Sequence, residues 1–185
     1  MVKQPVTLLA VISHPVFVET LYISYWSHWS LGWIVASFLV LVVMSGILYA
    51  WILRDKRDIA ILLGSERRFM LLWHLLAMTI LWGAVNDPLL YVWLSFFVWM
   101  SVGALLLHWR WEYSFHTYGW AGMSGFYTGY LIDYPWHMLF FTMGTLGVGW
   151  LRYYQKAHTW TEIGRGGLMG WLIALGYVGF HRWTG

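Results

Sequence analysis

The stretch 118–134, YGWAGMSGFYTGYLIDY, decides the fold of this chain, because it decides how many times the chain crosses a bilayer. It is apolar and rich in small residues, and its length is at the short end of the range that spans a membrane as a helix. If it crosses, nine of the eleven lysines and arginines fall on one side of the membrane; if it does not, seven do. Because cytoplasmic loops carry an excess of Lys and Arg, the sequence predicts that it crosses, with the basic loops in the cytoplasm and both termini outside.

The composition of the whole chain is that of a membrane protein. Hydrophobic residues make up 60% of its 185 residues, and charged residues only 10%. Every backbone polar group in hydrocarbon must be paired within the protein, so we expect an all-α polytopic membrane protein with six transmembrane helices. The expected spans are 29–53, 69–85, 89–108, 118–134, 135–150 and 163–180.

A chain of this length is expected to form one transmembrane domain, 1–185, with an interfacial segment at 1–28 and a helical bundle at 29–182. Its expected location is the cell inner membrane, and its first partner the lipid bilayer. The 16 tryptophans and 12 tyrosines are typical of aromatic belts at the two membrane surfaces. The absence of cysteine excludes disulfides and thiolate chemistry. No dense basic face indicates nucleic-acid binding.

Metal-ligating residue types recur at four-residue spacing at His108, Glu112 and His116. On a continuous helix these side chains would line one side. Imidazole combined with carboxylate suits zinc, iron or copper. The segment also lies at an expected membrane boundary, where polar residues are common. Two interpretations therefore stay open, a transition-metal site and an interfacial loop.

Histidines at the ends of several expected spans could instead ligate haem b, which takes two imidazoles from different helices at matched depth. The two pairs with matched depth are His74 with His108 and His28 with His137. The alternative for each residue is a histidine that faces lipid headgroups.

The motif GMSG, 122–125, places Ser124 between glycines. Glycines let other backbone approach closely, and unpaired N–H groups at the start of a helix could stabilise an oxyanion, as a serine nucleophile requires. Small residues in membrane helices also serve as packing surfaces. Both roles remain open for Ser124.

Six spans with Gly-x-Ser-Gly opening the fourth resemble the layout of the rhomboid-type intramembrane serine proteases. The stretch WHLLAM, 73–78, is similar to the family's His-x-x-x-Asn element, and GRGGLMG, 164–170, to its glycine-rich sixth span, which packs against the fourth. The resemblance covers about 67–179. It implies that Ser124 is the nucleophile and that His74, with the Ser124 amide, forms the oxyanion site.

The chain departs from that family pattern at two places. Met78 stands where the family has asparagine, and the sixth span lacks the family's histidine at its start. His158, shortly before that span, is then the candidate for the general base, because serine without a base is a poor nucleophile.

Three functions are expected from these patterns. The first is a rhomboid-like intramembrane serine hydrolase, or an inactive relative, that needs no cofactor and meets a transmembrane substrate or a larger membrane complex. The second is a haem b- or metal-binding subunit of an electron-transfer or oxidase or monooxygenase complex. The third is a structural membrane subunit whose histidines lie at headgroup depth.

Overall fold

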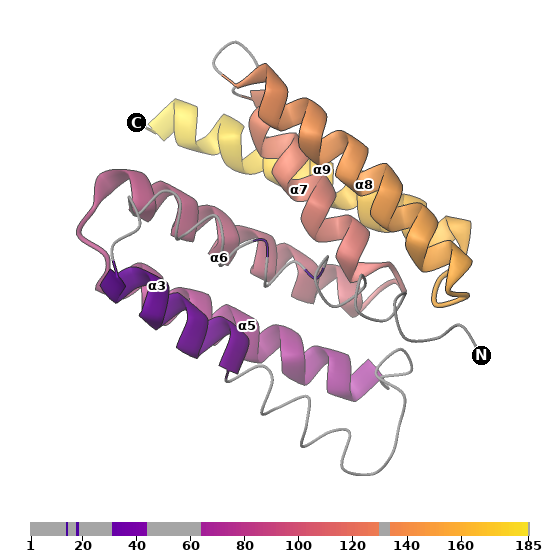
Figure 1. Ribbon diagram of the computed structural model, residues 1–185, viewed down its shortest axis with the longest axis horizontal. Helices are drawn as coiled ribbons and strands as arrows, with labels where there is room; N and C mark the ends of the chain where they lie inside the picture. Colours follow the sequence, from indigo (N-terminus) through magenta and orange to yellow (C-terminus); the bar gives the residue numbers. More distant parts are fainter. Residues whose placement is uncertain (1–13, 15–17, 19–30, 44–63, 130–133, 185) are drawn as a thin grey trace. The chain divides into compact units, whose positions relative to one another are not determined.

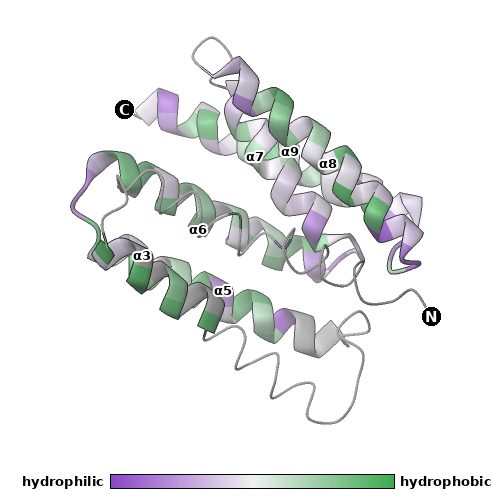
Figure 2. Cartoon of the chain, viewed as in Figure 1, coloured by the Kyte–Doolittle hydropathy of each residue, from purple (hydrophilic) through white to green (hydrophobic). Residues whose placement is uncertain are grey.

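The computed structural model of the protein describes residues 14, 18, 31–43, 64–129 and 134–184. The described residues form helices and connecting turns without any strand, so the all-α prediction is confirmed for them (Figure 1). Hydrophobic residues run along the helices, and hydrophilic residues gather at helix ends and turns (Figure 2). The chain divides into two compact units, 16–105 and 1–15 with 106–185, which are described separately below.

The unit 16–105 begins its described part with α3, Leu31–Ser37, which continues as a π-helix, η1, Phe38–Val43. These helices lie within the predicted span 29–53, the rest of which falls outside the described residues. Next come α5, Gly64–Ala84, and α6, Pro88–His108. The spans predicted at 69–85 and 89–108 are therefore confirmed as helices, although α5 begins five residues earlier than predicted.

A tight turn joins α5 to α6, as the sequence Asn86-Asp87-Pro88 predicts. The Leu90 N–H donates to Asp87 Oδ1 at 2.9 Å, so Asp87 caps the helix. Pro88 is the first helical residue, where its missing N–H costs nothing and its fixed φ suits the helix. The acid and the proline together explain why α6 begins here.

Both helices of this hairpin bury residues at alternating intervals of three and four. The buried residues at this spacing are Leu71, His74, Met78, Leu81 and Val85 on one side of the turn, and Leu90, Trp93, Phe97, Met100 and Ala104 on the other; Ala77, Leu94, Phe96 and Ser101 are buried beside them. That period is typical of a helix that buries one face. His74 and Met78, two positions of the family resemblance, therefore belong to an apolar seam.

The described part of the second unit contains the end of α6 and three further helices: α7, Phe115–Gly129, α8, Pro135–Tyr154, and α9, Trp160–Thr184 (Figure 1). Helix α7 packs most extensively against α9 and next against α8. Glu162 lies against Ser114 just before α7, and a side chain on Gly129 would meet Val178, so α7 and α9 run parallel. Helix α7 thus begins three residues before the predicted span 118–134. Helices α8 and α9 are longer than predicted.

Small residues at four-residue spacing bring α7 and α9 into backbone contact. They are Gly125 and Gly129 on α7, and Gly166, Gly170 and Ala174 on α9. A Cβ on Gly125 would lie 2.6 Å from the Trp171 carbonyl oxygen, and one on Gly166 would lie 2.5 Å from that of Ser114. Such small-xxx-small faces are a common way for membrane helices to associate. The predicted packing of the glycine-rich last span against the helix of Ser124 is confirmed.

Two described helices, α6 and α9, are long and apolar enough to cross a membrane. The apolar part of α5, Arg68–Ala84, is shorter. The prediction of membrane-spanning helices is supported to this extent, and the full count of six spans stays a prediction.

Candidate functional site

Ser124 lies in the second half of α7, not at its start. The helix begins at Phe115 because Ser114 occupies the cap position, where its carbonyl accepts the Tyr118 N–H at 3.0 Å. Backbone N–H groups inside a helix are paired with carbonyls four residues back. The expected oxyanion site at a helix start is therefore wrong for Ser124.

The hydroxyl of the buried Ser124 is paired with α8. Its Oγ lies 2.7 Å from Thr142 Oγ1. Thr142 donates its own proton to the Met138 carbonyl at 2.8 Å, so Ser124 donates to Thr142. The proton that a nucleophilic serine would give to a base is directed at a threonine.

The backbone of Ser124 is tied to α9 in the same way. Trp171 Nε1 donates to Thr128 Oγ1 at 3.2 Å, and Thr128 donates to the Ser124 carbonyl at 2.8 Å. Polar contacts at this level therefore join α9, α7 and α8. Hydrogen bonds between helices hold membrane bundles together.

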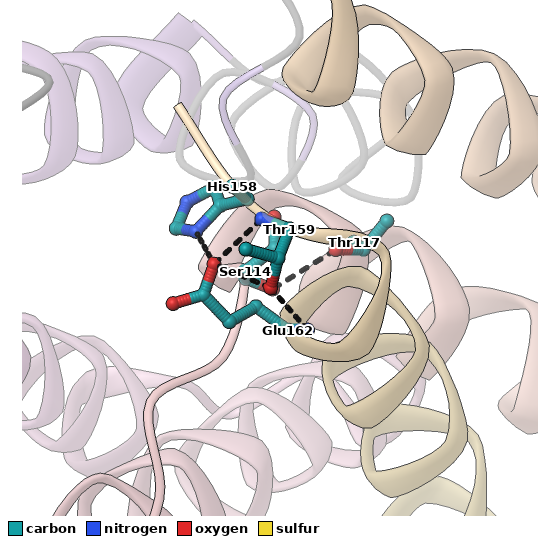
Figure 3. Close-up of polar contacts among 5 residues, drawn as sticks. All are labelled: Ser114, Thr117, His158, Thr159 and Glu162. Carbon is teal, nitrogen blue, oxygen red and sulfur yellow. Dashed lines mark hydrogen bonds and ion pairs between the residues drawn. The ribbon is translucent and has the colours of Figure 1, made fainter. Parts of the chain in front are cut away.

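His158 lies just before α9, beside the residues that start this helix (Figure 3). Its Nδ1 is 3.5 Å from Glu162 Oε2. The same carboxylate oxygen accepts the Thr159 N–H at 2.7 Å, and the Glu162 N–H donates to Thr159 Oγ1 at 3.3 Å. Threonine and glutamate three residues apart thus form a capping box, which explains why α9 begins at Trp160.

The capping box also fixes His158 at the level where α7 begins. The Ser114 N–H donates to the Glu162 carbonyl at 3.1 Å (Figure 3). Ser124 is ten residues farther along α7, which at 1.5 Å per residue is about 15 Å. The structure therefore does not bring His158 and Ser124 together, and the predicted nucleophile–base pair is wrong. Distance along the sequence could not reveal this, because it depends on the register of α9 against α7.

His74 belongs to the other unit, where it is buried in the seam of α5 four residues before the fully buried Met78. Its contribution to an oxyanion site at Ser124 stays a prediction.

The metal site predicted from His108, Glu112 and His116 stays a prediction, but their ladder on one side requires one continuous helix, and the chain has none there. The N–H groups of Arg110 and Trp111 both donate to the Leu107 carbonyl at 2.9 Å, which ends α6, and the next helix begins only at Phe115. The ladder prediction is therefore wrong.

The three residues of the predicted ladder have different surroundings. The His108 ring lies 6.3 Å from the Tyr113 ring, and Glu112 is exposed. The His116 ring instead meets His14, at a centroid distance of 5.0 Å. Sequence reasoning missed this contact, because nothing local links two residues from opposite parts of the chain.

The predicted haem ligands come from different parts of the chain. His28 lies outside the described residues, and His74 and His108 belong to different units. His137, in the first turn of α8, stacks on Tyr127 at 4.9 Å and meets Tyr134 edge-on at 5.6 Å. Both haem pairs stay predictions.

Comparisons with models of protein families, with curated proteins and with solved structures found no match for this chain.

Proposed function

We propose that this chain is a non-catalytic membrane subunit, an inactive relative of the rhomboid-like hydrolases. Its helices would support a larger membrane complex. One observation carries the proposal: the Ser124 hydroxyl donates to Thr142 on α8 and lies about 15 Å along the helix from the level of His158. A serine becomes nucleophilic only when an adjacent base takes its proton. The geometry favours a role in helix packing.

A membrane location is supported by the outer face of α8 as well as by α6 and α9. Trp136 is 78% exposed at one end of α8, and Trp150 and Tyr154 are 58% and 64% exposed toward the other. Trp136 and Tyr154 are about 27 Å apart along the axis, close to the roughly 30 Å of the hydrocarbon core. The exposed residues between the two ends include Leu139, Phe140, Met143 and Leu146. Aromatic residues at both ends of an apolar face are typical of a helix that crosses a bilayer.

Helix α7 is about 22 Å long, which is short for a membrane-spanning helix. Neighbouring helices, however, cover much of its surface. Every residue from Ala121 to Tyr127 is buried, and α8 and α9 pack on it. Irregular or short elements are tolerated at membrane depth where protein surrounds them. This supports the six-span arrangement with α7 as an enclosed central helix.

The placement of basic residues in this unit supports the proposed orientation. Because α7 and α9 are parallel and α8 joins them, the start of α7, the end of α8 and the start of α9 lie at one end. The basic residues at that end are Arg110, Arg152, Lys156 and Arg165, whereas Arg182 lies at the other end of α9. We propose that the basic end faces the cytoplasm, across the cell inner membrane.

A fluorophosphonate labelling experiment tests the non-catalytic proposal. We expect the detergent-purified protein to stay unlabelled under conditions that label a serine hydrolase. Labelling of the wild type that is lost in Ser124→Ala would overturn the proposal.

The stability of Ser124→Ala provides a second, positive readout. Loss of one interhelical hydrogen bond is expected to lower the free energy of unfolding by about 0.6–2 kcal/mol, measured by chemical unfolding in detergent. Ser101→Ala is the matched control, because its buried hydroxyl donates only to the Phe97 carbonyl in its own helix. Equal effects of the two substitutions would contradict a packing role for Ser124.

A further inference from the structure

We propose that His14 and His116 form a two-imidazole site for a divalent transition-metal ion, with Cu²⁺ as the preferred ion. The two rings have centroids 5.0 Å apart and planes at 86°. His116 is the second residue of α7, and Phe115 beside it also contacts the His14 ring, at 5.9 Å. Two contacts therefore hold His14 against the start of α7.

The separation of the rings matches what a shared ion requires. Two imidazoles bound to one ion at about 2.0–2.1 Å have ring centroids roughly 4.5–5 Å apart, whether the two bonds meet at the square-planar angle that Cu²⁺ prefers or at the tetrahedral angle. The terminal χ2 torsion of histidine has a broad energy well, so each ring can turn a nitrogen toward a common point without movement of the backbone. Both residues are partly exposed, which gives an ion access from water.

The chemistry of the site selects the ion. Imidazole nitrogens bind copper, zinc and nickel well, and affinities of a given nitrogen site for divalent ions peak at Cu²⁺. Among the described residues no three His, Asp or Glu side chains gather in a way that could hold an ion. The proposal therefore rests on the two imidazoles alone. The positive end of the α7 dipole opposes a cation by only about 0.3–1 kcal/mol, which is small beside two metal–nitrogen bonds.

This inference does not depend on the proposed function, since it uses neither Ser124 nor the membrane orientation. A failed metal experiment would leave the labelling result unaffected, and the reverse is also true.

Titration with Cu²⁺, followed by electron paramagnetic resonance, tests the site. The full chain is purified without a histidine tag, stripped with chelator and titrated with the metal alone. We expect one tight Cu²⁺ with a nitrogen-coordinated spectrum. His14→Gln and His116→Gln should each weaken its binding at least tenfold, while the helical content measured by circular dichroism stays unchanged.

His137→Gln is the matched control. It removes a partly buried histidine of the same unit at the opposite end of α7, where it contacts Tyr127, and it should leave the tight binding unchanged. Because histidine must lose its proton to bind metal, the affinity should also fall as the pH is lowered. Tight binding that survives in both site variants, or a wild type without tight binding, would overturn the proposal and leave the ring contact as packing only.

Discussion

Gly170→Ala is expected to lower the free energy of unfolding by about 1–3 kcal/mol, because it adds a methyl group where none fits. The new Cβ would collide with the Tyr118 carbonyl oxygen, and the next nearest atoms are also Tyr118 backbone. No side-chain rotation relieves a clash with backbone, so α9 must move away from α7. The contacts of Gly166 and Gly125 along the same interface would loosen with it.

Gly167→Ala is the control for this substitution, because it makes the same chemical change three residues away on α9. A Cβ there meets nothing within 4 Å. Alanine is also a better helix former than glycine by about 1 kcal/mol, so stability should stay equal or rise. Unfolding in detergent, followed by the fluorescence of the 16 tryptophans, measures both variants. Equal stabilities of the two variants would contradict close α7–α9 packing.

Met143→Arg is expected to lower the equilibrium constant for membrane insertion of α8 about a hundredfold. Met143 is 60% exposed and lies near the middle of the outer face of α8. Arginine at the centre of a membrane helix costs about 2.5–3.5 kcal/mol in insertion experiments. A topology reporter placed between α8 and α9 measures the fraction of chains in which α8 crosses.

Tyr154→Arg controls for the added charge. Tyr154 is the last residue of α8 and is similarly exposed, but it lies at the proposed membrane surface. There a long arginine side chain reaches water, and its cost is small. If α8 crosses the membrane in the same fraction of chains in both variants, this face of α8 does not meet lipid.

The helices of this protein could be predicted well from its sequence because their signals are local. An apolar run bounded by charges marks α6, and the acid and proline of 86–88 mark its start. The capping box at 159–162 is equally local, and its Thr-x-x-Glu pattern in the sequence marks the start of α9. The ends of these helices differ from the predicted spans by up to five residues, because an apolar run marks the part of a helix that meets lipid and not its polar ends.

The candidate site could not be predicted, because it depends on the register between helices. The glycines around Ser124 are equally consistent with a nucleophile and with close helix packing. The hydrogen-bond partner of the Ser124 hydroxyl decides between these two roles, and this partner is Thr142 on another helix. The contact of His14 with His116 is likewise invisible to spacing, because it joins residues from separate parts of the chain.

Disulfide trapping tests the assignment of Ser124 most directly. The chain has no cysteine, so a double variant carries only the two introduced thiols. The Ser124 and Thr142 hydroxyl oxygens are 2.7 Å apart, so sulfur atoms that replace them lie close to the S–S bond length of about 2.05 Å. Oxidation should therefore remove maleimide-reactive thiols from Ser124→Cys/Thr142→Cys and leave them in Ser124→Cys/His158→Cys. Efficient trapping of the second pair, with free thiols in the first, would contradict the packing role of Ser124.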